Sequence, residues 1–431
     1  MKELYERELL WELKKWAERR EVLAIKGPRQ SGKTTLLKLF AEWLEKEKGV
    51  RPENSIFLTF EDKEVLEKFA LGPKDFIKSF VRGEEKHYFL LDEFHYAKDG
   101  GQKLKLLYDT LENVKFVVTG SSSLEIVALS KHLVGRVFSF YLFPFNFHEF
   151  LKARDERIAK IYEKRNSTVR NFILEGKELG IEEDIFLSDM QKFFEEYAVL
   201  GGYPEVIKGV DAETKRVVLK NIYETYLGRD VIELLRIQDI FKFRKLVSLL
   251  SSQVGSLINY NQLASACDSY YKEVIGLLNV LEETYVIKLV RPFHRNLRTE
   301  LRKNPKVYFI DAGLRNYIAN NFNPLETRSD AGALVENHAL LALFNLVKDF
   351  GKVNYWRTLS KAEVDFVLSS GEDIIPVEVK YSDFRGPKVS RSFRSFLTAY
   401  KPERGVVLTK NFWGEMRTSG TEIKFVPICY M

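Results

Sequence analysis

A glycine-rich segment near the amino terminus contains the residue types that phosphate chemistry needs. It fits the pattern G-x-x-x-x-G-K-[ST] through Gly27, Pro28, Arg29, Gln30, Ser31, Gly32, Lys33 and Thr34, and Thr35 follows. The glycines allow the backbone to wrap closely, so that successive N–H groups point at phosphate oxygens. Lys33 would bring its charge to the β- and γ-phosphates, and Thr34 would give its hydroxyl to magnesium. A strand pattern precedes the segment and a helical pattern follows it, which is the context that this motif requires.

The apolar stretch HYFLLDEF at 87–94 ends with two adjacent acids before its final phenylalanine. Asp92 could hold magnesium directly or through water. Glu93 could orient and deprotonate the attacking water, so its presence predicts hydrolysis and not binding alone. An acidic turn after a buried strand is the alternative, and the glycine-rich segment upstream makes the catalytic interpretation the stronger one.

Further polar candidates lie between 114 and 136. The stretch VKFVVTGSSS ends in hydroxyl groups, and Thr119 and Ser121 are candidates for a polar sensor near the γ-phosphate, although serines at such positions also cap helices. Arg136 could reach a neighbouring subunit's γ-phosphate and stabilise transition-state charge, which would require a homo-oligomer. A structural ion pair is the alternative for Arg136.

The chain has 431 residues, which is too long for one ordinary hydrophobic core, so we expect several domains. The order of the elements indicates what these domains are. Short apolar strands alternate with helical patterns up to residue 145, which indicates a parallel α/β sheet. Residues 146–230 are helical and charged, with a break at GGYPE (201–205). Residues 240–306 contain two helical patterns, then a strand and a basic segment. This order is typical of a winged helix. Strands return in the last hundred residues.

Composition excludes several classes of protein. Hydrophobic residues make up 45% and charged residues 30%, which describes a soluble globular protein. No apolar run reaches the roughly 18 residues that a membrane-spanning helix needs. Two cysteines, Cys267 and Cys429, argue against a disulfide scaffold and for a reducing interior, so we expect a cytoplasmic protein without a membrane partner.

The motifs together resemble a family of prokaryotic, largely archaeal, AAA-type ATPases that carry a C-terminal domain of unknown function with a nuclease-like fold. The matching segments are GPRQSGKTT, FLLDE, TGSSS, LVGRV, LFPFNFHEF, GGYPE, KVYFIDAGLRN, GALVENHAL, YWRT, EVDFV and PVEVKYS. They span nearly the whole chain in the family's order. One departure is Phe94-His95, where the family often has an aliphatic residue and glutamine, which leaves the role of His95 near the γ-phosphate open.

The resemblance implies an α/β protein with four parts. These are an AAA-like P-loop ATPase core at 1–145, a helical lid or linker at 146–230, a winged-helix-like domain at 231–320 and a restriction-endonuclease-like α/β domain at 321–431. ATP and Mg²⁺ are the expected cofactors. The sequence has no guanine-specific N-K-x-D motif after its strands, which favours ATP over GTP.

The C-terminal part contains a second candidate site. Asp365 precedes Glu378 and Lys380 by one hairpin-sized gap, and strand periodicity places Glu378 and Lys380 on one face. Two carboxylates could hold divalent metal over a scissile phosphate, with Lys380 orienting water. The resemblance adds Glu336 as a further carboxylate. A binding module without nuclease activity is the alternative, since such residues are also common on exposed strands.

Basic clusters point to a polyanionic partner such as DNA. Residues 288–306 contain seven Lys or Arg against one acid, and 380–410 contain eight against two. In the winged-helix interpretation, 270–283 would be the recognition helix, beginning with Tyr270, Tyr271 and Lys272. The phosphate-facing residues would be Arg291, Arg295, Arg298, Arg302 and Lys303. A module that binds another protein is the alternative.

The sequence therefore predicts magnesium-dependent ATP hydrolysis that drives conformational change in a DNA-binding protein. Two alternatives remain open. One is a slow nucleotide-dependent switch that acts through protein partners and has an inactive C-terminal domain. The other is an ATP-gated, metal-dependent nuclease, for which Asp365→Ala would abolish cleavage while hydrolysis persists.

Overall fold

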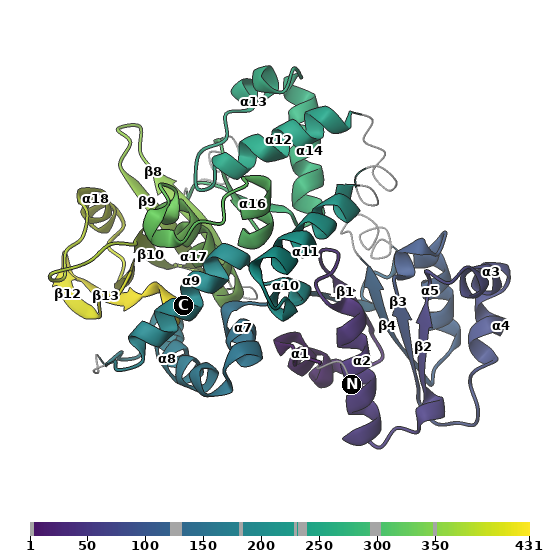
Figure 1. Cartoon of the computed structure of the whole chain (residues 1–431). Coiled ribbons are helices and arrows are strands. Elements are labelled where there is room, and N and C mark those ends of the chain that lie inside the picture. The colour runs from purple at the N-terminus through teal and green to yellow at the C-terminus, as the bar shows by residue number, and fades with distance from the viewer. Residues whose placement is uncertain are drawn as a thin grey trace.

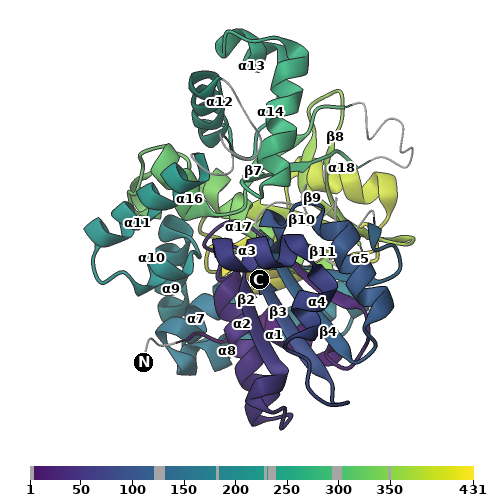
Figure 2. The same cartoon turned by 90° about the vertical axis from the view of Figure 1, so that its right-hand side faces the viewer.

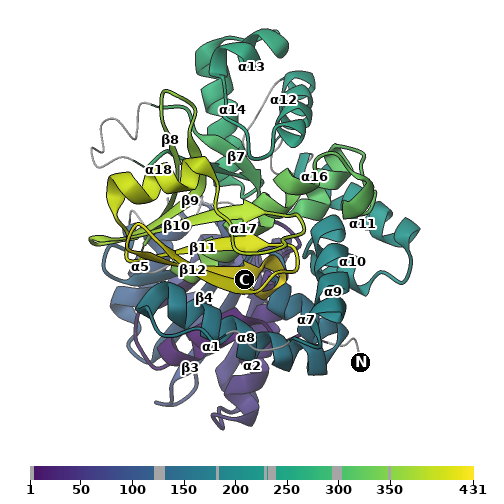
Figure 3. The same ribbon diagram turned by 90° about the vertical axis from the view of Figure 1, so that its left-hand side faces the viewer.

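The computed structural model describes residues 4–120, 132–180, 184–227, 231, 239–293, 303–347 and 351–431. Its parts are an amino-terminal sheet domain, a helical region, a group of helices with a small hairpin, and a carboxy-terminal sheet domain (Figure 1). Figure 2 shows the amino-terminal domain in front of the rest, and Figure 3 shows the carboxy-terminal sheet from the opposite side. No helix among the described residues is long and apolar enough to cross a membrane.

The amino-terminal sheet is parallel, as the alternating pattern predicts. In the described part of the chain its order is β2-β3-β4-β1-β5. The strands are β1 (Val22–Lys26), β2 (Ser55–Thr59), β3 (His87–Asp92), β4 (Val114–Gly120) and β5 (Val137–Tyr141). Because parallel strands end at one edge, the segments that follow β1, β3 and β4 meet there.

Helices cover both faces of this sheet. On one face are α1 (Glu8–Trp16) and α2 (Lys33–Lys46), whose apolar side chains pack with those of β1. On the other are α3 (Lys63–Leu71), α4 (Pro73–Lys78) and α5 (Gly100–Thr110). Short 3₁₀ turns lie at η1 (Pro52–Asn54) and η2 (Phe94–Tyr96). Burial on both faces explains why the central strands read as continuous apolar runs.

The helical region contains α7 (Phe147–Arg154), α8 (Glu156–Glu175), α9 (Leu187–Leu200), α10 (Pro204–Lys208) and α11 (Ala212–Thr225). Asn146 and Glu149 form a reciprocal capping box that starts α7. The Asp155 carboxylate caps α8. One continuous apolar core runs from this region into the rest of the chain up to Met431.

Two glycines allow the helical region to closely approach the segment after β5 and helix α16 (Ala312–Ile318). The carbonyl oxygen of Gly202 accepts a hydrogen bond from the Phe145 N–H at 2.7 Å, and the Gly202 N–H donates to Asp311 Oδ2 at 2.7 Å. A Cβ on Gly202 would lie 2.1 Å from the Phe145 carbonyl oxygen, and one on Gly313 would lie 2.0 Å from that of Leu200. The break at GGYPE is therefore a packed junction.

The next part contains α12 (Ile240–Ser252), α13 (Tyr260–Ala266) and α14 (Tyr271–Glu283), followed by an antiparallel pair, β6 (Ile287–Val290) and β7 (Lys306–Phe309). The sequence predicted two helical patterns here, whereas the structure has three helices among the described residues. The short α13 was missed because 7 residues give too few turns for a periodic signal.

The carboxy-terminal domain follows α16 (Ala312–Ile318) and η4 (Leu325–Thr327). Its described strands form a mixed sheet in the order β12-β13-β11-β10-β9-β8. The elements are α17 (Ala331–Val347), β8 (Lys352–Arg357), β9 (Glu363–Ser370), β10 (Asp373–Lys380), α18 (Arg391–Tyr400), β11 (Arg404–Thr409), β12 (Gly414–Thr418), β13 (Thr421–Pro427) and η5 (Ile428–Tyr430). Helices α17 and α18 pack against apolar strand residues in two separate clusters.

Replacing Gly202 by alanine should destabilise the fold. The added methyl group would meet backbone atoms that cannot move independently, so we expect the free energy of unfolding to fall by about 2 kcal/mol or more in urea denaturation. Gly276→Ala is the matched control, because nothing lies within 4 Å of its added Cβ in α14. The control should be neutral or stabilise by up to about 1 kcal/mol. Equal effects of both changes would contradict a tight junction at Gly202.

Candidate phosphate site and C-terminal cluster

The glycine-rich loop joins β1 to α2 at the edge where the parallel strands end. Gly27 and Gly32 adopt φ values of +155° and +97°, and Gln30 is also left-handed at +60°. A Cβ on Gly27 would lie 2.0 Å from the Leu142 carbonyl oxygen, so only glycine fits there. Pro28, Arg29 and Ser31 are the other residues of this loop.

Lys33 lies inside this loop. Its side chain is almost fully buried, and Nζ donates hydrogen bonds to the carbonyl oxygens of Gly27 and Pro28, each at 3.0 Å. Thr34 and Thr35 follow in the first turn of α2. The helix amino terminus and the buried ammonium group together favour an anion at this place.

Asp92 connects the loop to the neighbouring strands. Its Oδ2 accepts a hydrogen bond from the Thr34 hydroxyl at 2.8 Å, and its Oδ1 accepts one from the Thr119 hydroxyl at 2.7 Å. Burial raises the pKa of Asp92 and outweighs these two hydrogen bonds, which lower it. Threonine hydroxyl and carboxylate oxygens are ligands that Mg²⁺ accepts, so Thr34 and Asp92 fit the ion that the motif implies.

Glu93 follows Asp92 in a left-handed conformation with φ +49°. Its N–H donates to the Thr119 hydroxyl oxygen at 2.9 Å, and its Oε2 lies 3.1 Å from Nδ1 of His95. Burial raises the pKa of Glu93, but the hydrogen bond from His95 and the charge of Lys33 outweigh it and lower the pKa to about 2. Glu93 is therefore ionised at neutral pH, and His95 is the residue that contacts it.

One predicted site residue, Arg136, is not brought to this place. Ser121 lies outside the described residues. Arg136 immediately precedes β5, at the edge of the sheet opposite to the glycine-rich loop, and its backbone oxygen accepts from Val22 at the start of β1. Its Nε donates to Asp109 Oδ1 at 3.0 Å, so the structural ion pair is present. A role of Arg136 at a neighbour's nucleotide stays a prediction.

A pair of residues beside the loop was missed at the sequence level. Arg7 donates to the Ser31 carbonyl oxygen at 2.7 Å, and it forms an ion pair with Glu149 at 3.0 Å. The N-x-x-E spacing at 146–149 signals the helix start that holds Glu149. No local pattern connects Arg7 to it, because 142 residues separate the two in the chain.

The C-terminal candidates do gather. The Asp365 carboxylate accepts from the Val379 N–H at 2.8 Å, and Lys380 lies 3.1 Å from Glu378. Burial, followed by the charge of Glu336, raises the pKa of Asp365 to about 7, although Lys306 and Lys380 lower it. Burial lowers the pKa of Lys380, but the charges of Glu378 and Asp365 outweigh burial, so the net effect raises the pKa. Glu378 is 3% exposed, so it does not lie on an exposed strand face.

Lys306 is the residue that changes the interpretation of this cluster. It was counted among the basic surface residues, but it is 2% exposed, and its Nζ lies 3.1 Å from Glu336 and 2.6 Å from Glu363. Tyr308 also donates to Glu336, at 2.6 Å. Burial lowers the pKa of Lys306, but Glu336 and Glu363 outweigh it and raise it. An internal ammonium group thus occupies the position between the carboxylates.

The cluster does not fit the divalent metal that a nuclease-like site implies. Among the described residues, no group of three or more His, Cys, Asp or Glu side chains is placed to hold a metal ion. The buried ammonium group of Lys306 already pairs with Glu336 and Glu363, which weakens the attraction of these carboxylates for a metal ion.

The predicted basic surfaces are only partly described. Arg295, Arg298 and Arg302 lie outside the described residues. The amino terminus of α14 is exposed at Tyr270, Tyr271 and Lys272. On α18 and beside both of its ends, a basic surface is formed by Arg385, Lys388, Arg391, Arg394 and Lys401, which are all exposed. None of these five forms an ion pair with another described residue.

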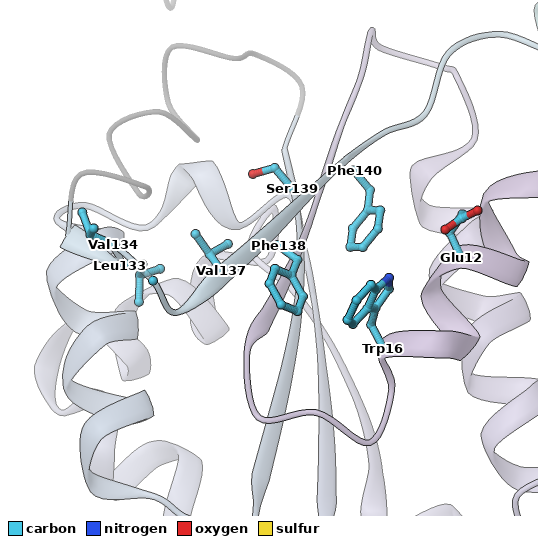
Figure 4. Close-up of a pocket in the computed structure, with 9 residues that line it drawn as sticks. Glu12, Trp16, Leu133, Val134, Val137, Phe138, Ser139 and Phe140 are labelled. Atoms are coloured by element: carbon cyan, nitrogen blue, oxygen red, sulfur yellow. The ribbon is translucent and has the colours of Figure 1, made fainter. Parts of the chain in front are cut away.

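A hollow of about 570 Å³ lies beside β5 and away from the phosphate site (Figure 4). Trp16 and Glu12 of α1 face it from one side, and Phe138 and Phe140 of β5 line it. It contains none of the predicted site residues.

Comparison with protein families assigns the amino-terminal part. Residues 19–151 match the family described as "AAA domain". The chain carries an AAA-like P-loop ATPase domain. Its five-stranded parallel sheet, within the described residues, agrees with this assignment. Residues 191–325 and 331–429 match two families described as domains of unknown function, DUF8612 and DUF4143.

Relatives of this chain occur in archaea and bacteria. An uncharacterized protein of Methanocaldococcus jannaschii is 22% identical over 366 residues, which are 84% of this chain and 75% of the relative. An uncharacterized protein of Mycobacterium tuberculosis is 24% identical over 389 residues, which are 89% of this chain and 75% of the relative.

Solved structures show only distant similarity. The Aeropyrum pernix ORC1 protein in complex with DNA has a TM-score of 0.31 and 14% identity, over 74% of this chain and 94% of that one. AMPPCP-bound DnaA from Aquifex aeolicus has a TM-score of 0.27 and 15% identity, over 64% and 86%. Similarities this low support no conclusion about ligand or partner.

The pairing of Glu93 predicts how acid affects stability. Its folded pKa of about 2 lies below the ordinary value of 4.5, so its contribution is present above pH 4.5 and is lost as the pH falls through about 2. Between pH 6 and pH 3 the wild type should lose about 2 kcal/mol more unfolding free energy than Glu93→Gln in urea titrations. Parallel losses in both proteins would show that the pKa of Glu93 is not depressed.

Removing the ammonium group of Lys306 should destabilise the protein strongly. Lys306→Met leaves buried carboxylates without their cation, so we expect a loss of about 3–5 kcal/mol in urea denaturation. Lys288→Met is the control, because Lys288 pairs with Glu282 at the half-exposed surface, where about 1 kcal/mol or less is expected. A metal centre predicts otherwise: Mn²⁺ would raise the melting temperature of the nucleotide-free wild type, and Asp365→Asn would abolish that increase.

Proposed function

We propose that this chain hydrolyses ATP with magnesium and uses the cycle to change conformation in a DNA-binding protein. The observation that carries the proposal is the convergence of Lys33, Thr34 and Thr119 on the Asp92–Glu93 pair. Lys33 would contact the phosphates, Thr34 and Asp92 would hold magnesium, and ionised Glu93 would accept a proton from water. Thr119 would fix both acids in place.

Contacts beyond the loop suggest how hydrolysis could be transmitted. Pro204 of α10 would lie 3.8 Å from a Cβ on Gly32 in the phosphate loop. Gly202, two residues before Pro204, accepts a hydrogen bond from the Phe145 N–H and donates one to the Asp311 carboxylate. A change at the loop can therefore act on α10, and through Asp311 on the domain that follows.

The basic surface of α18 supports DNA as the partner. Its exposed arginines and lysines suit contacts with phosphates, which are independent of sequence and sensitive to salt. The helices α12 to α14 with the hairpin β6–β7 are consistent with a winged helix, in which Tyr270, Tyr271 and Lys272 would begin the recognition helix.

A regulatory switch acting through protein partners is the second candidate. Lys306 favours it in one respect, since a neutralised cluster at Glu336 and Asp365 suits an inactive C-terminal domain. The same observation weighs against the ATP-gated nuclease. In either function, a homo-oligomer would place Arg136 against a neighbour's nucleotide.

Phosphate release by the full chain with ATP and magnesium tests the proposal. We expect hydrolysis by the wild type, a loss of at least about 100-fold in Glu93→Gln, and several-fold stimulation by DNA. Replacing both Arg391 and Arg394 by alanine should abolish the stimulation and leave hydrolysis without DNA unchanged. It should also reduce the slope of log affinity against log salt by about 2.

The control removes two exposed lysines of the helical region, Lys160 and Lys192, which form local ion pairs. That variant should respond to DNA as the wild type does. Hydrolysis that is indifferent to DNA would shift the function to the protein-partner switch, and no hydrolysis under any condition would contradict the role of Glu93.

A further inference from the structure

Arg7 is a charged side chain that is buried against the phosphate loop. It is 3% exposed, although it lies before the first helix and outside the sheet. Burying a guanidinium group is costly unless its donors are satisfied. Here the donors reach the Ser31 carbonyl oxygen at 2.7 Å, the Phe143 carbonyl oxygen at 2.7 Å and both oxygens of Glu149 at 3.0 and 3.2 Å.

The contact with Ser31 fixes the direction of one peptide group. In a trans peptide the carbonyl and the following N–H point to opposite sides. When Arg7 Nη1 holds the carbonyl of Ser31, the N–H of Gly32 is directed away from Arg7. Gly32 belongs to the phosphate motif and directly precedes α2. Its N–H is therefore one of those that would donate a hydrogen bond to a nucleotide phosphate.

Glu149 holds Arg7 in this position. The Glu149 Oε1 also accepts from the Glu8 N–H at 2.8 Å, and its Oε2 accepts from the Asn146 N–H at 3.1 Å. The guanidinium group lies 4.7 Å from the centre of the Phe145 ring. The segment LFPFNFHEF thereby supplies a carbonyl, a ring and a carboxylate to one arginine, which gives this motif a role.

We propose that Arg7 and Glu149 form a clamp that positions the phosphate loop for nucleotide binding. Arg7 is a positioning residue, since it acts through the Ser31–Gly32 peptide group. The proposal rests on the proposed function for its effect on ATP, but its effect on the loop exists without nucleotide. The clamp also makes the segment before α1 a part of the nucleotide site.

Arg7→Lys tests the clamp without removing the charge that balances Glu149. A lysine has a single ammonium group and cannot reach the Ser31 carbonyl, the Phe143 carbonyl and both Glu149 oxygens together. In hydrogen–deuterium exchange of the nucleotide-free chain, amides in 27–34 should exchange about tenfold faster than in the wild type, while amides of β3 and β4 stay unchanged. The KM for ATP should rise about tenfold with kcat within about twofold, because a contact present in both ground and transition states is lost.

Arg19→Lys is the matched control, because Arg19 pairs with Glu21 at the exposed surface. It should alter neither exchange nor KM. Glu149→Gln should reproduce the faster loop exchange of Arg7→Lys, since it weakens the same pair. Unchanged exchange in 27–34 for both Arg7→Lys and Glu149→Gln would overturn the clamp. A wild type that fails to hydrolyse ATP while Arg7→Lys still accelerates loop exchange would support the clamp and contradict the proposed function instead.

Discussion

The phosphate site depends on where the carbonyl groups of the loop between β1 and α2 are directed. Two cations of the same chain hold them: Lys33 takes the carbonyls of Gly27 and Pro28, and Arg7 takes that of Ser31. With the carbonyls of Pro28 and Ser31 bonded, the N–H groups of Arg29 and Gly32 face the other way. The close approach of Gly27 to Leu142 fixes the start of the loop against the segment that directly follows β5.

A buried cation that bonds to acceptors of the same chain also occurs in the C-terminal domain, with a different consequence. There Lys306 lies between Glu336 and Glu363, and its buried ammonium group is the partner of both carboxylates. Because Lys306 comes from β7, the ion pairs also join the hairpin to the C-terminal sheet. This arrangement is consistent with the proposed binding role of the domain, in which the exposed arginines of α18 would face the partner.

The sequence was informative wherever the signal is local. The loop from Gly27 to Thr34, the acids at the end of β3 and the strands of the parallel sheet could all be predicted, because each combines a motif with its flanking periodicity. The gathering of Asp365, Glu378 and Lys380 also followed from strand periodicity. The burial of Glu378 and the ion pairs of Lys306 did not, because they depend on elements that meet only in the folded chain. Arg7 and Glu149 escaped prediction for the same reason, and α13 was too short to show a period.

Calorimetric titration of the full chain with ATP, with and without magnesium, tests the central claim most directly. The structure predicts one site per chain, tighter binding with magnesium, loss of binding in Lys33→Ala, and loss of the magnesium effect in Asp92→Asn. Binding that survives Lys33→Ala with unchanged affinity would place the nucleotide elsewhere and contradict the account.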